Sequence, residues 1–218
     1  MTGRDAVLAW VAERVEGLPT DRVRRVGVDG VDGAGKTVFA DELAVVLSGR
    51  GVLVVRASVD GFHHPAQVRH RRGRHSPEGF FRDSYDYVRM REALLDPVAP
   101  GGSGLVRTAV NDVATDTPVE LAPVALGPGD VLLVDGIFLH RPELRPCWDW
   151  SVFLQVDFAV SVPRGAARDG TDPDPAADSQ QRYVQGQRLY LAECAPYRHA
   201  SAVIDNADLA APRVLRGS

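Results

Sequence analysis

Lysine is almost absent from this sequence of 218 residues. Of its 25 basic side chains, 24 are arginine, and the one lysine is Lys36. The two residue types differ in chemistry, because an ammonium is a compact charge with rotatable donors whereas a guanidinium is a planar fork. We therefore interpret Lys36 as a position at which a compact ammonium is needed.

Cysteine is scarce as well, and the sequence has neither long apolar runs nor an excess of positive charge. Two cysteines, Cys147 and Cys194, cannot form a disulfide framework, which favours a reducing, cytoplasmic environment. No run approaches the roughly 18 apolar residues of a membrane span. With 29 acidic against 25 basic side chains the net charge is −4, so we expect neither nucleic acid nor a membrane as partner. The oligomeric state stays open, a homo-oligomer included.

A glycine-rich motif surrounds the single lysine. Residues 30–37 read Gly-Val-Asp-Gly-Ala-Gly-Lys-Thr and match G-x-x-x-x-G-K-[ST] at every fixed position. Residues 25–29 are typical of a buried strand and 38–47 of a helix, which is the context that this phosphate-binding loop requires. Lys36 would reach the β- and γ-phosphates of a nucleotide, and Thr37 would ligate Mg²⁺. The backbone of the loop would surround the phosphates through Gly30, Asp32, Gly33, Ala34 and Gly35.

The scarcity of lysine also bears on the identity of the nucleotide. Guanine recognition usually needs an Asn-Lys-x-Asp motif, which is impossible when the only lysine lies in the phosphate-binding loop. We therefore expect ATP, bound with Mg²⁺. A glycine-rich turn without a ligand is the alternative interpretation.

Two acids follow apolar strands. Asp60 comes after the apolar residues 52–55, and Asp135 follows residues 131–134 directly. Acids at the carboxyl ends of parallel strands lie where open α/β sheets bind their ligands. We expect Asp135 to hold Mg²⁺ together with Thr37. We interpret Asp60 as catalytic rather than as a cap of the turn after its strand.

Strands and helices alternate along the whole chain. Further strands are predicted over 152–156 and 202–205, and residues 105–126 alternate weakly, as a hairpin does. Helices are predicted over 5–16, from 83–86 to about 95, and over 159–169 and 181–194. The pattern predicts an α/β fold in which a doubly wound, mostly parallel sheet has helices on both faces, in one domain over residues 1–218.

An ordered set of short motifs runs through about residues 24–206. Besides the glycine-rich motif it comprises Asp60-Gly61-Phe62-His63, Asp83-Ser84-Tyr85-Asp86, Val134-Asp135-Gly136-Ile137, Arg164, Arg168-Asp169, Arg182-Tyr183, Arg188 and Val203-Ile204-Asp205-Asn206. This set resembles the uridine kinase, pantothenate kinase and phosphoribulokinase group of P-loop kinases, and uridine kinase-like proteins most of all. The resemblance implies a P-loop NTPase fold with a five-stranded parallel core and a mobile lid over about residues 164–182. It also implies transfer of the γ-phosphate of ATP to a hydroxyl of a small-molecule acceptor.

The resemblance implies roles for individual residues. Asp60 matches the family's acid that orients and deprotonates the acceptor hydroxyl, and Lys36 and Arg168 would stabilise the charge that develops during transfer. Arg164 and Asn206 would join Arg168 in binding ATP. Contacts to the acceptor are implied for Phe62, His63, Tyr85, Asp86 and Arg188. For Asp86 an equal alternative is that it only complements the dipole of a helix in its first turn.

The acceptor itself stays open. In uridine kinases the hairpin carries a Tyr-Asp pair, then a His and an Arg that help to read the base. Residues 110–117 here read Val-Asn-Asp-Val-Ala-Thr-Asp-Thr, which keep the Asp but neither the Tyr nor the His. A nucleoside acceptor comes first, pantothenate or a sugar second, and a nucleotide-dependent regulator is a different class of function. The arginine-rich segment, residues 69–74, has three interpretations: a solvated loop, an anion-binding wall or a nucleic-acid contact.

Overall fold

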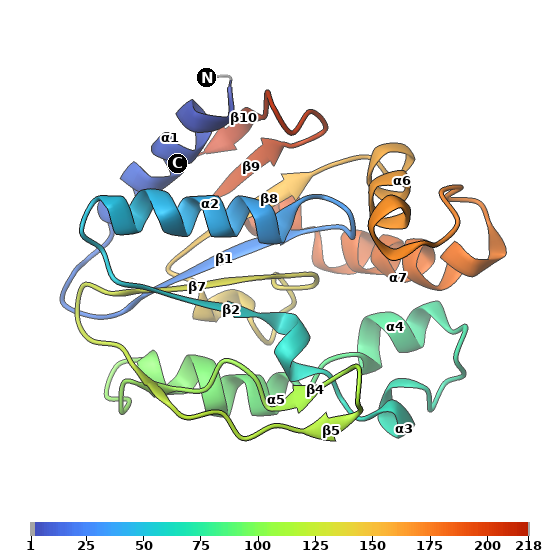
Figure 1. Cartoon of the computed structure of the whole chain (residues 1–218), viewed down its shortest axis with the longest axis horizontal. Coiled ribbons are helices and arrows are strands. Elements are labelled where there is room, and N and C mark those ends of the chain that lie inside the picture. The colour runs from blue at the N-terminus through green and yellow to red at the C-terminus, as the bar shows by residue number, and fades with distance from the viewer. Residues whose placement is uncertain (1–2, 218) are drawn as a thin grey trace.

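Six strands form one sheet at the centre of the computed structural model, which describes residues 3–217 (Figure 1). Their order across the sheet is β10-β9-β8-β1-β7-β2. The five parallel strands are β1 (Arg24–Gly30), β2 (Val54–Ser58), β7 (Val131–Gly136), β8 (Trp150–Gln155) and β9 (Ala202–Asp205). The expected α/β fold with a mostly parallel sheet is confirmed. A sixth strand, β10 (Arg213–Gly217), pairs antiparallel with β9 and was not predicted from the sequence pattern.

The sheet is buried on both faces because helices cover each of them. Val131 and Leu133 of β7 pack with α1 (Arg4–Glu16) and α2 (Lys36–Gly49) on one face. Leu132 and Val134 of the same strand pack on the opposite face. All four side chains are completely buried. This two-sided burial explains why the strand is an uninterrupted apolar run and not an alternating pattern.

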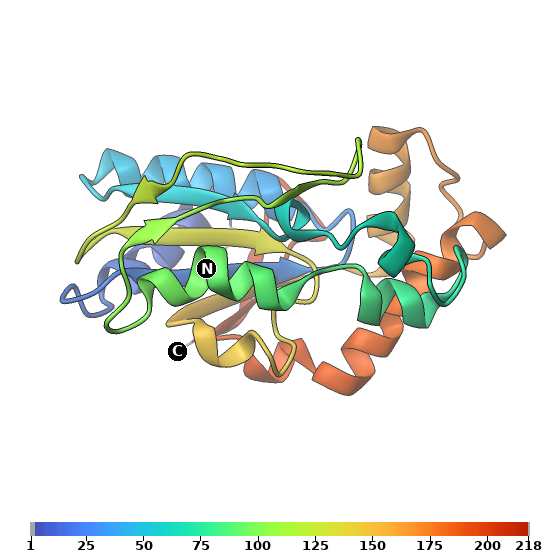
Figure 2. The ribbon, with the colours of Figure 1, turned by 90° about the horizontal axis from the view of Figure 1, so that it is seen from below.

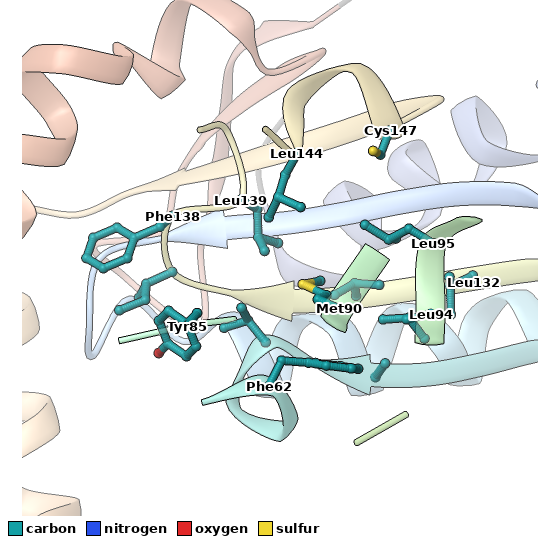
Figure 3. Close-up of a cluster of buried hydrophobic side chains, with 14 of the residues drawn as sticks. Phe62, Tyr85, Met90, Leu94, Leu95, Leu132, Phe138, Leu139, Leu144 and Cys147 are labelled. Atoms are coloured by element: carbon teal, nitrogen blue, oxygen red, sulfur yellow. The ribbon is translucent and has the colours of Figure 1, made fainter. Parts of the chain in front are cut away.

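A cluster rich in aromatic residues fills the second face. Figure 3 shows Phe62, Tyr85 and Phe138 in this cluster together with the aliphatic side chains of Met90 and Leu94. The helices that contribute to it or cover it are α4 (Pro77–Asp83), α5 (Tyr87–Met90) and α7 (Asp178–Cys194). The helix expected to reach residue 95 ends at residue 90 in α-helical form and continues as a π-turn (Arg91–Leu95) and a 3₁₀ turn (Asp96–Val98).

Short elements complete the chain. They are α3 (Ala66–Arg69), α6 (Phe158–Asp169), α8 (Pro196–His199) and the 3₁₀ turns Val59–Phe62 and Arg145–Cys147. Within residues 105–126, β3 (Leu105–Val106) pairs with β6 (Val124–Ala125), and β4 (Asn111–Asp112) pairs with β5 (Thr117–Pro118). Figure 2 shows α6 at one end of the sheet, next to α7. Among residues 3–217, no helix is both long enough and apolar enough to cross a bilayer.

The parallel register brings the carboxyl ends of β1, β7 and β2 to one edge of the sheet. Asp29 of β1 lies beside Gly136 of β7, and Ser58 of β2 lies beside Asp135 of β7. From β1 the chain goes to β2 on one side of the sheet, and after β7 it continues to β8 on the other side of β1, so the direction of the connections reverses at β1. Open α/β sheets bind their ligands at such a switch point, outside the carboxyl ends of the strands.

Candidate active site at the carboxyl ends of the strands

The glycine-rich loop connects the end of β1 with the start of α2. Gly33 and Gly35 have φ angles of +72° and +87°, which are left-handed conformations that side chains disfavour. A Cβ on Gly33 would also lie 1.9 Å from the carbonyl oxygen of Ser161 in α6. The Lys36 ammonium donates to the carbonyl of Val31 at 2.9 Å, inside the loop. Loop amides, a lysine and the start of a 14-residue helix together fit a polyphosphate.

Two amides from distant elements hold this loop in place. Asn206, which follows β9 and is completely buried, donates from Nδ2 to the carbonyl of Ala34 at 2.7 Å. Gln187 of α7 accepts from the backbone N–H of Asp32 at 2.6 Å and donates to its carboxylate at 3.2 Å. The sequence analysis missed Gln187. A signal was present, because Gln180, Val184 and Gln187 share one buried face of their helix.

Asp32 marks the place where the charged groups of the site converge. Burial raises the pKa of its carboxyl, and the charge of Asp60 adds to this effect. The charges of Lys36 and Arg168 act in the opposite direction. These four side chains therefore share one electrostatic environment, although they come from three different segments of the chain.

An oxygen pair that suits Mg²⁺ lies beside the loop. The Thr37 hydroxyl donates to Oδ2 of Asp135 at 2.8 Å, and only 3% of the Asp135 side chain is exposed. Hydroxyl and carboxylate oxygens are hard ligands of the kind that Mg²⁺ takes in nucleotide sites. Arg56 of β2 donates to the other carboxylate oxygen at 2.9 Å and to the carbonyl of Leu133 at 3.0 Å. The sequence analysis predicted Thr37 and Asp135 but missed Arg56.

Asp60 lies in the 3₁₀ turn after β2 with its carboxylate exposed. Its Oδ1 accepts from the Tyr85 hydroxyl at 3.0 Å, and its backbone carbonyl is 2.9 Å from Nδ1 of His63. The rings of His63 and Tyr85 lie 4.4 Å apart. Burial, together with the charge of Asp60, raises the pKa of Tyr85 well above its ordinary value, so this hydroxyl remains a donor. The Asp60 carboxylate is thus oriented by one hydrogen bond and keeps its second oxygen accessible.

Two cavities adjoin this arrangement. The larger, of about 660 Å³, is lined on one side by Asp60 and His63; the smaller, of about 360 Å³, is lined by Asp32 and Arg168 beside the glycine-rich loop. Ser179 and Tyr183 of α7 belong to the walls of both cavities. We refer to them as the Asp60 cavity and the loop cavity. A molecule in the Asp60 cavity would therefore be a neighbour of one bound at the loop.

Four of the five residues expected to contact an acceptor line neither cavity. Tyr85 is one of them, but it donates to Asp60, which does line a cavity. The other three are placed as follows. Phe62 is completely buried in the aromatic cluster, where it packs the sheet. Asp86 caps α5 by accepting from the backbone N–H of Arg89 at 3.0 Å, which is the helix-terminus role given above as its alternative. Arg188 is exposed on α7 with its guanidinium 5.7 Å from the ring of Phe158. The contacts to an acceptor implied for these three residues do not match their placement.

The two arginines expected to bind the nucleotide are placed differently. Arg168 lines the loop cavity and forms an ion pair with Asp169 at 2.6 Å. Arg164 donates to the backbone carbonyls of Asn206, at 3.0 Å, and Ala207, so that it ties α6 to the segment after β9. It lines neither cavity.

A buried polar network beneath the loop also escaped the sequence analysis. The completely buried Asp29 accepts from the Tyr190 hydroxyl, from the backbone N–H of His140 at 3.2 Å, and bonds Nδ1 of His140 at 2.6 Å. Nε2 of His140 lies 2.9 Å from the hydroxyl of Ser151. An acid inside a buried strand, directly before a glycine-rich loop, was the available signal. The network joins β1, β8 and α7 at the point where the loop begins.

Comparisons with known proteins bear on the fold. No family model matches the chain. A protein of Bacillus stearothermophilus described as a possible uridine kinase is similar, with a TM-score of 0.72 and 21% identity over 91% of this chain and 97% of that one. A candidate fructose transport system kinase from Silicibacter sp. TM1040 is similar, with a TM-score of 0.66 and 24% identity over 87% and 94%. A D-glycerate 3-kinase from Cryptococcus neoformans matches with a TM-score of 0.51 and 14% identity over 88% and 87%. The chain has the fold of P-loop kinases.

Proposed function

We propose that the protein is a kinase that transfers the γ-phosphate of ATP to a hydroxyl of a small molecule. One observation carries the proposal: an oriented, exposed carboxylate, Asp60, lines a cavity that adjoins the one beside the glycine-rich loop. Nucleotide hydrolysis or switching needs no such carboxylate at a second cavity. Phosphoryl transfer to an alcohol does, because the acceptor oxygen must be positioned and must lose a proton.

Each group of residues has its own role in the proposed reaction. The loop amides and Lys36 hold the phosphates, and Asp60 orients the acceptor hydroxyl in line with the γ-phosphate. Oδ1 of Asp60 is engaged by Tyr85, so Oδ2 is the atom that takes the hydroxyl proton as the new P–O bond forms and the bond to ADP breaks. Thr37 and Asp135 would hold Mg²⁺, whose charge offsets that of the phosphates.

Arg168 is proposed to act at the transferring group. Its side chain is 71% exposed and lies in the wall of the loop cavity, and Asp169 is the acid that pairs with it. A guanidinium at that wall can turn towards the phosphates, stabilise their charge and exclude water. A lid over about residues 164–182 within a single domain, as the resemblance implies, remains a prediction.

The nucleoside acceptor suggested by the resemblance also remains a prediction. The names of the similar structures mention three different compounds, uridine, a fructose transport system and glycerate, and each name belongs to that protein. We therefore propose the reaction class, and leave the choice among nucleosides, pantothenate and sugars to an acceptor panel.

Asp60→Asn tests the proposal. Purified protein with ATP and Mg²⁺ is assayed for ADP release with uridine, cytidine, pantothenate, ribulose 5-phosphate and small sugars. For the acceptor that stimulates release, Asp60→Asn should lower kcat by about 10²- to 10⁴-fold. Binding of ATP, measured by calorimetry, should not change.

Asp86→Asn is the matched control. It makes the same chemical change at an acid that caps a helix and lines neither cavity, and asparagine caps helices equally well. The proposal is wrong if Asp60→Asn keeps the turnover of Asp86→Asn. Release that no acceptor stimulates, equal in both variants, would favour the nucleotide-dependent regulator.

A further inference from the structure

Much of the lining of the Asp60 cavity is cationic. Arg69, Arg74 and Arg182 line it, together with His70 and His75. The residues come from the arginine-rich segment and from α7, which are more than 100 positions apart in the sequence. Such a concentration of guanidinium groups inside a concave site needs an explanation, because like charges repel one another when they are brought together.

The arginine-rich segment divides into two groups. Arg71 and Arg72 turn away from the cavity and pair with the buried Asp83, the latter at 2.9 Å. Arg69 and Arg74 face the cavity instead. The first pair is structural. Of the second pair, Arg69 also donates from Nε to the backbone carbonyl of His64 at 2.8 Å, which fixes its side chain at the cavity.

The cavity arginines are poorly neutralised. Arg69 pairs with Asp116 at the tip of the hairpin, at 3.2 Å. No carboxylate of residues 3–217 forms an ion pair with Arg74 or Arg182. Arg182 donates from Nη1 to the backbone carbonyl of Arg74 at 2.8 Å, which holds these two residues together but leaves both charges in place.

The electrostatics of the wall agree with this charge count. Burial, together with the positive charges of Arg69 and Arg74, lowers the pKa of Arg182. Burial and the charges of Arg182, Arg69 and Arg74 likewise lower the pKa of His70. The neighbouring arginines thus act on both groups as positive charge, while the charge of Tyr183 opposes them at Arg182 and that of Asp116 opposes them at His70.

Two buried nitrogen atoms in this wall also lack partners. Nε of Arg182 and Nδ1 of His70 are shielded from solvent, and neither forms a hydrogen bond within the described part of the chain. Buried polar atoms are nearly always hydrogen-bonded in proteins, and Nε–H of Arg182 is always a donor, so it calls for an acceptor atom beside this cavity. A phosphate or a carboxylate supplies both the oxygens and the negative charge.

We propose that the acceptor of this kinase carries an anionic group, a phosphate or a carboxylate, that binds Arg69, Arg74 and Arg182 while its hydroxyl faces Asp60. The inference rests on the kinase activity proposed above and deepens it by naming the substrate class. The three guanidinium groups outnumber the two carboxylates of Asp60 and Asp116, which leaves an excess positive charge that a neutral nucleoside does not balance. Binding of the anion by the arginines and of the hydroxyl by Asp60 would together fix the orientation of a small acceptor.

Binding of inorganic phosphate tests the cationic wall without any turnover. Calorimetry is done with ADP and Mg²⁺ at saturation, so that the glycine-rich loop is occupied and phosphate reports on the wall. Arg74→Gln and Arg182→Gln should each weaken phosphate binding about ten- to hundredfold, as expected for the loss of a charged hydrogen bond. Arg198→Gln is the matched control, because Arg198 is exposed on α8 and lines neither cavity.

Matched acceptors test the same wall during turnover. ADP release is compared for glycerol, glycerate and glycerol 3-phosphate, for ribose and ribose 5-phosphate, and for pantothenol and pantothenate, with uridine as the neutral nucleoside. The anionic member of the productive set should have the higher kcat/KM, and the phosphate and carboxylate members tell the two anions apart. Arg74→Gln should raise KM for that acceptor about ten- to hundredfold and leave KM for ATP unchanged.

The outcomes separate this inference from the proposed function. It is overturned if phosphate binding is the same in Arg74→Gln, Arg182→Gln and Arg198→Gln, or if a neutral member of the productive set is preferred. An increase in KM for ATP instead of the acceptor would assign the arginines to the nucleotide and also overturn it. If no acceptor stimulates ADP release, the kinase proposal fails, whereas the phosphate titration still decides whether the wall binds an anion.

Discussion

The contact between Gly33 and α6 provides a sharp test of the site. The carbonyl oxygen of Ser161, in the first turn of α6, would lie 1.9 Å from a Cβ on Gly33. Real Cβ atoms essentially never approach a neighbour more closely than 3.0 Å, so in Gly33→Ala the loop and the helix must separate by about 1 Å. Both partners of the clash are backbone, so a change of rotamer cannot relieve it.

Two terms contribute to the expected loss of stability. The first is the left-handed backbone at φ +72°, which costs a residue with a Cβ about 1–2 kcal/mol. Gly51→Ala isolates this term, because Gly51 has φ +85° and a Cβ there would meet nothing within 4 Å. At about 2–4 °C per kcal/mol for a chain of this size, Gly51→Ala should lower Tm by roughly 2–8 °C. The second term is the clash with the carbonyl of Ser161, which Gly51→Ala lacks, so Gly33→Ala should lower Tm by more than this control does.

The second consequence of Gly33→Ala is functional. A displacement of about 1 Å in a loop that surrounds phosphates should weaken ATP binding by about tenfold or more, measured by calorimetry. Gly51→Ala should bind ATP as the unmodified protein does, since Gly51 lies at the far end of α2. If Gly33→Ala has the Tm and the ATP affinity of Gly51→Ala, the packing of α6 against the loop does not form part of the site.

Three further predictions concern carboxylates and their partners. Hydrogen bonds from Arg71 and Arg72 outweigh the opposing effect of burial and lower the pKa of Asp83, so its ionised form stabilises the fold above about pH 4 and this contribution is lost as the pH falls through the lowered pKa. Asp83→Asn should therefore cost about 1–3 kcal/mol of unfolding free energy in urea at pH 7 and nothing at a pH where Asp83 is protonated; an equal loss at both pH values would contradict the assignment. Burial raises the pKa of Asp32, so the unmodified protein should lose stability as the pH rises through that value. Asp32→Asn should remove this pH dependence, and parallel stability curves between pH 4 and 8 would show that the carboxyl is not desolvated. Tyr85→Phe removes the hydrogen bond to the proposed base and should lower kcat about threefold to tenfold with unchanged ATP affinity, whereas an effect on ATP affinity alone would refute its positioning role.

Local patterns predicted much of the fold and part of the site. Strands β7 and β8 are apolar runs buried on both faces, and such runs are visible in one sequence because each residue is apolar for the same reason. The run at residues 52–55 was also recognised, although β2 is at the edge of the sheet and only partly buried. The glycine-rich loop was predicted because its conformation depends on glycines at fixed, neighbouring positions. The structure brings Lys36, Asp60 and Asp135 to one edge of the sheet because parallel strands end together there. The edge strand β10 was missed, since it is mostly exposed and carries polar residues.

The choice among the arginines could not be predicted in this way. Five of the six residues 69–74 are arginine or histidine, and the sequence alone does not distinguish Arg71, which pairs with Asp83, from Arg74, which faces a cavity. The direction of a side chain in an irregular segment depends on its packing against other elements, and no periodicity records it. The same holds for Arg188, where a motif suggested an acceptor contact and the helix turns the side chain towards solvent.

Residues close together in the chain encode three features of this protein: the alternation of strands and helices, the phosphate-binding loop and the acids that follow two strands. Which distant side chains complete the site depends instead on how the whole chain folds. Gln187 contacts Asp32 across 155 positions and Asn206 contacts Ala34 across 172, and both contacts exist because the sheet order brings β9 and α7 against the loop after β1. Hydrogen bonds of this kind depend on the geometry of the whole chain, whereas helices, strands and turns are encoded over a few residues.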